Sequence, residues 1–239
     1  MRKIPSKYQI DLIAIVAPDI PVSFTAALES LGIIVQVRDL PVQYEEVPEG
    51  FVRESAKTTG CCGFGELLKL YGFLLTEYHR VEVMDPDMVM INNGDEILEA
   101  EESLLFTRGG SEPDGAFMGG WWTIKPNVTQ FEEMVAIIRK GDWRSGNLVV
   151  RESNSFTLCD FYMLGTGWEG SGIGWIFGGM AIQGIVPFYF WKKCPRTFWR
   201  DLPGAIWDNY GEKSWANASR NVKISYYSET SFYQLAHNY

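Results

Sequence analysis

The alternation of apolar segments in the first third of the chain is the feature that most constrains its fold. Residues 10–17 form an apolar run of strand length, residues 21–31 carry apolar side chains at helical spacing and stop at Gly32, and residues 33–37 are again strand-like. A strand, a helix and a strand in this order are typical of a β-α-β unit, in which the two strands are parallel.

A second unit of the same kind follows. Apolar residues recur at helical spacing over residues 66–75, and a strand then runs up to Asp85. Residues 116–124 are strand-like, with a break at the pair Gly119 and Gly120. The alternation predicts an α/β fold with a mostly parallel central sheet and helices on both faces, whose ligands bind at the carboxyl ends of strands.

The last predicted helix is expected to begin with Thr129 as its cap. From Trp143 onward the sequence is rich in glycine and aromatic residues and shows no regular pattern that would assign helices or strands. One face of the predicted helix would hold Phe131, Met134, Val135 and Ile138.

Size and charge limit the classes of protein to which the chain can belong. A chain of 239 residues with 46% hydrophobic content can bury one large core, so we expect a single domain over residues 1–239. A net charge of -9 argues against a nucleic-acid partner, because such proteins need a basic face. No apolar run approaches the roughly 20 residues of a membrane span, and residues 1–17 lack a signal-peptide pattern. The cytoplasm and the Golgi lumen both stay open as compartments.

The four cysteines form no C-x-x-C motif, so a zinc ribbon or a thioredoxin-type site is not expected. Two glycosylation sequons begin at Asn127 and Asn217 and would matter only in a secretory lumen.

Two carboxylates, Asp85 and Asp87, directly follow an apolar strand. In an extended segment, side chains at i and i+2 point to the same face, so both carboxylates could hold one hard divalent cation beside bound phosphates. Pro86 favours an extended Asp85, and the apolar run of residues 88–91 comes next. A solvated turn after the strand is the alternative.

Several ordered motifs resemble those of glycosyltransferase family 8, the glycogenin-like nucleotide-sugar transferases. The core of the resemblance is Lys69-Leu70, then Leu75-Thr76-Glu77-Tyr78-His79-Arg80-Val81, then Asp85-Pro86-Asp87. Four further pieces follow in the order of the family: residues 92–98, Gly119-Gly120-Trp121-Trp122 with Lys125-Pro126, Gly178-Gly179 with Gln183-Gly184, and Ala236-His237.

This resemblance implies a single-domain, Rossmann-like type A glycosyltransferase fold and a retaining hexosyltransferase. The implied donor is a UDP-sugar, most often UDP-glucose, bound with Mn²⁺, for which Mg²⁺ is an alternative, and the acceptor is an unidentified glycan or protein. Carried over to this sequence, the metal ligands would be Asp85, Asp87 and His237. The nucleotide sugar would contact Lys69, Asp85, Asp87, Gly119, Gly120, Gly179 and Gln183, and Gln183 would also orient the sugar or acceptor as the catalytic residue.

The chain departs from the family pattern at a few positions. Met118 stands where the family has Asn, and Ala181 and Ile182 stand where it has Asp. Compared with the family, the chain is expected to lack the first strand and the C-terminal Lys-Pro-Trp segment. These differences support a second hypothesis, a non-catalytic or truncated member that keeps the fold with at most residual nucleotide-sugar or metal binding.

Two other readings are weaker. Residues 165–170 match the dinucleotide pattern G-x-G-x-x-G, but they lie late in the chain and no acid follows at the expected distance. Cys61 or Cys62 could act as a nucleophile with His79 or His237, although nothing places a base beside either thiol. The oligomeric state stays open, with a homodimer as one alternative, and none of the eleven tyrosines can be singled out for self-glucosylation.

Overall fold

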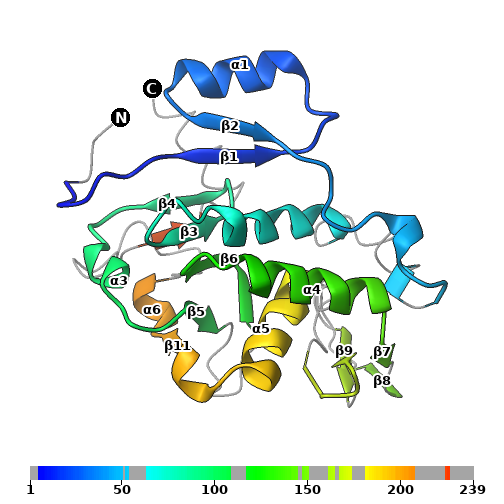
Figure 1. Cartoon of the computed structure of the whole chain (residues 1–239). Coiled ribbons are helices and arrows are strands. Elements are labelled where there is room, and N and C mark those ends of the chain that lie inside the picture. The colour runs from blue at the N-terminus through cyan, green and yellow to red at the C-terminus, as the bar shows by residue number, and fades with distance from the viewer. Residues whose placement is uncertain are drawn as a thin grey trace. The chain divides into compact units, whose positions relative to one another are not determined.

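The computed structural model describes residues 5–50, 52–53, 63–108, 117–144, 147–150, 161–164, 167–173, 181–207 and 224–226. It is a mixed α/β structure whose residues group into two compact units (Figure 1). The sheet unit consists of Met1–Ile10, His79–Lys125 and Thr197–Tyr239, and the helical unit consists of Asp11–Tyr78 and Pro126–Arg196. No helix in the described residues is long and apolar enough to cross a membrane.

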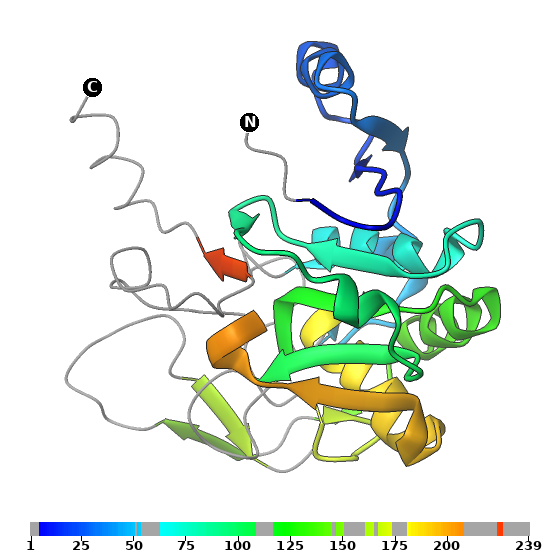
Figure 2. The same ribbon diagram turned by 90° about the vertical axis from the view of Figure 1, so that its left-hand side faces the viewer.

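A four-stranded sheet forms the centre of the sheet unit, in the order β11-β5-β6-β3 (Figure 2). Strand β11 runs parallel to β5, whereas β5 and β3 both run antiparallel to β6. A separate antiparallel pair is formed by β12 and β4. The bounds are β3 Val81–Met84, β4 Met88–Met90, α3 Asp95–Leu98, β5 Leu104–Arg108, β6 Phe117–Ile124, β11 Trp199–Leu202, α6 Gly204–Trp207 and β12 Ile224–Tyr226, with η3 Arg196–Phe198 at the border of the two units.

Large aromatic side chains fill the core of this unit. Trp121 on β6 is fully buried and stacks on Trp207 of α6, with ring centroids 5.4 Å apart. Phe106 on β5 packs against Phe117 and Trp199, at 5.4 and 5.9 Å. Each such ring removes a large apolar area from water, so these contacts hold the strands of the sheet together.

The predicted break at Gly119 and Gly120 is confirmed as an irregularity within one continuous strand. Phe106 of β5 pairs with Trp122 of β6, and the next matched pair is Arg108 with Phe117, so β6 bulges away from β5 between them. On its other side β6 stays paired with β3. Glycine commonly marks such bulges.

A buried arginine connects the start of β3 to the rest of the sheet unit. One terminal nitrogen of Arg80 donates to the carbonyl oxygens of Ala100 and Glu102, each at 2.7 Å, and the other donates to the hydroxyl of Thr123 at 3.4 Å. Desolvation by burial lowers the pKa of Arg80. The guanidinium therefore depends on these acceptors.

The predicted β-α-β opening is confirmed in the helical unit. Strands β1 (Ile13–Val16) and β2 (Ile34–Val37) are parallel, with Ile13 opposite Ile34, and α1 (Val22–Ser30) connects them. Gly32 follows the helix with a φ of +79°, a backbone conformation typical of the residue that ends a helix.

Three helices form the remaining core of this unit. Tyr71 of η2 contacts Phe131 of α4, and Phe73 of η2 stacks on Phe190 of α5. The hydroxyl of Tyr189 on α5 donates to Glu133 on α4. The bounds are η1 Tyr44–Glu46, η2 Phe64–Leu74, α4 Val128–Lys140, β7 Trp143–Arg144, β8 Asn147–Val150, β9 Phe161–Leu164, β10 Gly167–Trp168 and α5 Ile182–Lys193; β7 pairs with β10 and β8 with β9, both antiparallel.

The expectation of a mostly parallel sheet does not hold for the described strands. Only the pairs β1-β2 and β5-β11 are parallel there, and the other pairs are antiparallel. Only residues 109–116 connect β5 to β6. A parallel crossover needs a dozen or more residues, so these strands can pair side by side only in opposite directions.

Two details of helix prediction were wrong. The cap of α4 is Asn127, whose side-chain oxygen accepts from the backbone N–H of Gln130 at 3.1 Å, and Thr129 lies in the first turn instead. Helix α5 lies after Trp143, in the part of the sequence for which no helix was predicted. Its residues Ile182 and 184–190 are all buried, so polar and apolar residues do not alternate at helical spacing along this segment. Pro187 lies inside the helix.

Replacing Gly167 with Ala should destabilise the protein. A Cβ atom at Gly167 would lie 1.8 Å from the carbonyl oxygen of Ile173, and its φ is +60°. We expect the free energy of unfolding, measured by urea denaturation, to fall by about 3 kcal/mol. Gly172→Ala is the matched control, because its φ is +78° but a Cβ atom there meets no atom within 4 Å. The control should lose about 1 kcal/mol, and equal losses would contradict the steric explanation.

Replacing Arg80 with Lys should also be costly, because a single ammonium group cannot reach both carbonyls and the Thr123 hydroxyl. We expect a loss of about 3 kcal/mol in the free energy of unfolding. Arg144→Lys is the control, since Arg144 is exposed and pairs with Asp142 at 3.2 Å on the surface. That change should cost less than about 1 kcal/mol, and a similar small loss at Arg80 would rule out the structural role given to it.

Candidate functional site

The two carboxylates that the sequence singles out lie in the turn between β3 and β4. The backbone N–H of Met88 donates to the carbonyl oxygen of Asp85 at 3.1 Å, which closes a four-residue turn. Asp85 is partly exposed, and Pro86 and Asp87 are exposed. A turn therefore presents the carboxylates, whereas the prediction had assumed an extended segment.

Asp85 lies directly opposite Gly120. Its backbone N–H donates to the carbonyl oxygen of Gly120 at 2.8 Å and so continues the pairing of β3 with β6 by one residue. Gly119 and Gly120 are buried at the point where β6 bulges away from β5. The fold thus brings together Asp85 and the glycine pair, which the sequence analysis singled out as site residues although they are about 35 residues apart in the chain. Their proposed contacts with a sugar stay predictions.

A third carboxyl group, Glu82, lies on β3 three residues before Asp85. Desolvation raises the pKa of Glu82 to about 7, and the side chain of Trp121 and the charge of Arg80 oppose this only in part. The sequence analysis missed this residue. An acidic side chain between Val81 and Val83 in an apolar strand is the signal that could have found it.

Two other predicted site residues belong to the helical unit. Lys69 lies on η2, where its ammonium group pairs with the carboxylate of Glu66 at 2.6 Å and only 15% of its side chain is exposed. Gln183 is partly exposed in the first turn of α5. Their proposed roles toward phosphates and sugar stay predictions, as do those of Asp85 and Asp87 toward a metal.

The remaining predicted residues, Gly179 and His237, lie outside the described residues. Within the part of the chain that the structure describes, no group of three or more His, Cys, Asp or Glu side chains is arranged to hold a metal ion. The described part of the proposed metal site therefore consists of Asp85 and Asp87.

A cavity lies at the carboxyl end of β2 in the helical unit. Its volume is about 590 Å³, a size typical of small-molecule sites. Tyr71 contributes a ring that lies under the guanidinium of Arg38, and its hydroxyl donates to the carbonyl of Asp39 at 2.9 Å. The lining residues are Gln36, Val37, Arg38, Asp39, Tyr71, Leu74, Leu75 and Glu77, none of which was predicted as a site residue.

The chain resembles few known proteins in sequence, and its likeness to solved structures is distant. No protein-family model and no curated protein sequence matches the chain. Among solved structures, the apo form of mouse xyloside xylosyltransferase 1 is similar at 10% sequence identity and a TM-score of 0.48, over 92% of this chain and 85% of that chain.

The raised pKa of Glu82 predicts a dependence of stability on pH. The folded protein holds a proton on Glu82 up to about pH 7, whereas the unfolded chain releases it near the ordinary value of 4.5. Protonation thus stabilises the fold fully below pH 4.5, and this contribution is lost as the pH rises through 7. The loss should amount to about 2.5 kcal/mol in the free energy of unfolding between pH 5 and pH 8.

Urea denaturation at both pH values would measure this loss. Glu82→Gln should remove it, because an amide does not titrate, while Glu101→Gln should leave it unchanged, since Glu101 is 99% exposed. A Glu82→Gln protein with the same pH dependence as the original would show that another group is responsible.

Proposed function

We propose that the chain is a nucleotide-sugar glycosyltransferase in which Asp85 and Asp87 hold a divalent cation beside the donor diphosphate. The observation that supports this most directly is the turn itself. It presents two acidic residues at the end of a sheet strand, and its first residue is hydrogen-bonded to a glycine of the neighbouring strand. The ordered sequence motifs that resemble those of family 8 agree with this assignment.

The residues present fit a hard cation in part. Asp87 is exposed and Asp85 is partly exposed, and carboxylate oxygens suit Mn²⁺ or Mg²⁺. Two protein ligands leave coordination positions for phosphate oxygens and for a third ligand, which we propose is His237. When bound, the cation would stabilise the negative charge of the departing diphosphate.

The other proposed roles belong to side chains and to the backbone. Gly119, Gly120 and Gly179 would let the sugar approach the main chain, because they have no side chain to exclude it. Lys69 would leave Glu66 to meet a phosphate, and Gln183 would orient the sugar or the acceptor. We further propose transfer of a hexose, glucose first among them, from a UDP-sugar with retention of anomeric configuration. A glycan or protein would be the acceptor.

A specific observation favours the alternative of a non-catalytic member. Ile182 stands where the family pattern has Asp, and its side chain is 1% exposed within α5. Met118, which replaces Asn, is partly exposed next to Gly119. Ile182 has no polar atom and Met118 offers only a weakly accepting sulfur, so neither replaces the lost hydrogen bonds to a sugar, and binding without transfer is the expected behaviour under this alternative.

Isothermal titration of UDP into the protein, with and without Mn²⁺, tests the proposal. We expect binding that requires Mn²⁺ and becomes at least about tenfold weaker in the double variant Asp85→Ala, Asp87→Ala, because both proposed metal ligands are gone. The control variant Asp19→Ala, Glu29→Ala removes two exposed carboxylates of the helical unit and should bind UDP normally.

Release of UDP from UDP-glucose then separates the two functions. Turnover that needs Mn²⁺ and both aspartates supports the transferase, whereas binding without turnover, with any acceptor tested, supports the non-catalytic member. If the folded protein binds no UDP under any condition, the transferase proposal fails and the non-catalytic member is favoured.

A further inference from the structure

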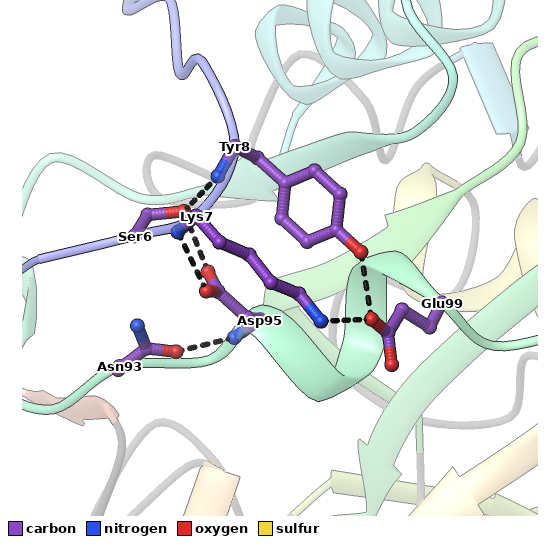
Figure 3. A network of polar contacts seen from close by, with 6 residues as sticks. All are labelled: Ser6, Lys7, Tyr8, Asn93, Asp95 and Glu99. Carbon is purple, nitrogen blue, oxygen red and sulfur yellow. Dashed lines mark hydrogen bonds and ion pairs between the residues drawn. The ribbon is translucent and has the colours of Figure 1, made fainter.

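The N-terminal residues 5–8 of the sheet unit make a network of polar contacts with α3 and with Glu99, which directly follows it (Figure 3). Ser6 donates its hydroxyl to one carboxylate oxygen of Asp95 at 2.6 Å, and the backbone N–H of Lys7 donates to the other at 3.0 Å. Both oxygens of Asp95 are thus bound by this segment. Hydrogen bonds to the carboxylate lower the pKa of Asp95, that of Ser6 most.

A second carboxylate, one helical turn farther on, receives the next two side chains. The hydroxyl of Tyr8 donates to Glu99 at 2.7 Å, and the ammonium group of Lys7 donates to the same oxygen. The hydrogen bond from Lys7 is the main cause that lowers the pKa of Glu99. At the start of the segment, the amide of Asn93 donates to the carbonyl oxygen of Pro5.

The two sides of this contact are held in place very differently. Helix α3 is held in place by the hydrophobic core. Its residue Ile97 is 2% exposed and packs in a cluster with Met88, Leu105, Trp121 and Trp207. Residues 5–8 form no helix or strand. The side chains of Lys7 and Glu99 are 59% and 51% exposed, so water and salt compete with their ion pair. Release of the segment would therefore leave α3 in its place.

The charge balance at this contact is narrow. Asp95 and Glu99 contribute two negative charges against the one positive charge of Lys7, and the Ser6 hydroxyl serves as a neutral donor. A negative group at Ser6 would replace a donor with an acceptor 2.6 Å from a carboxylate oxygen. An uncharged side chain at Lys7 would leave the two carboxylates without a cation.

We propose that residues 5–8 are a charge-gated latch on α3. The latch is closed when Ser6 is a free hydroxyl and Lys7 is charged, and it opens when Ser6 gains negative charge or Lys7 loses its positive charge. These are the charge changes that phosphorylation of a serine and acetylation of a lysine produce. This proposal is independent of the glycosyltransferase assignment.

Amide hydrogen exchange measures the state of the latch, because the N–H of Lys7 donates across the contact to Asp95 at 3.0 Å. In Ser6→Asp we expect the amide of Lys7 to exchange at least about tenfold faster than in the unmodified protein. Trypsin should also cleave after Lys7 faster. Ser23→Asp adds the same charge at an exposed serine of α1, in the helical unit, and should change neither measurement.

A second substitution tests whether charge is the cause. Asp95→Asn in the Ser6→Asp background removes the facing negative charge but keeps a side chain of the same shape, so exchange protection should return in large part. If Ser6→Asp keeps the original protection, or if Asp95→Asn fails to restore it, the charge-gated latch is wrong. Circular dichroism of each variant would show that the fold is retained, as the exposure of the segment predicts.

Discussion

The buried guanidinium of Arg80 is the contact on which the sheet unit depends. It lies just before β3 and joins that strand to the carbonyl oxygens of Ala100 and Glu102, which lead into β5, and to Thr123 on β6. A buried cation is tolerated only where acceptors surround it, so this group fixes three segments relative to one another. The register that places Asp85 opposite Gly120 follows directly from the position of β3 along β6. Any use of the carboxylate turn as a site therefore relies on a charge that is largely buried.

The parts of the fold that could be predicted from sequence are segments with an amphipathic period and segments that a glycine ends or interrupts. The strands around α1 and the helix end at Gly32 are of this kind, and so is the break at Gly119. Helix α5 could not be predicted, because a segment in which residues 184–190 are all buried shows no amphipathic period. Strand direction was predicted wrongly for β6, since direction depends on which strands become neighbours and on the length of the connection.

The candidate site was predictable only as a set of residues, not as an arrangement. The sequence pointed to Asp85 and to Gly120, but their contact arises from strand register, which no local pattern encodes. The family resemblance implies that Lys69 contacts a phosphate of the donor. In the structure its ammonium group pairs with Glu66, which lies three positions earlier on η2. Glu82 was not predicted as a site residue, because apolar neighbours identify a strand but say nothing of the acid within it. A buried acidic side chain is nevertheless more informative about function than the apolar residues around it.

The two carboxyl groups of β3 and its turn have different environments for a geometric reason. Successive side chains of a strand point to opposite faces, so Glu82 and Asp85, three residues apart, lie on opposite sides of the sheet. Glu82 is desolvated and keeps its proton up to about pH 7, whereas Asp85 begins an exposed turn. A cation held by Asp85 and Asp87 could not recruit Glu82 without reversing the strand. The remaining ligands of such a cation would come from water, from another segment or from the donor, and a donor that supplies phosphate oxygens would make the proposed binding of UDP and of the metal mutually dependent.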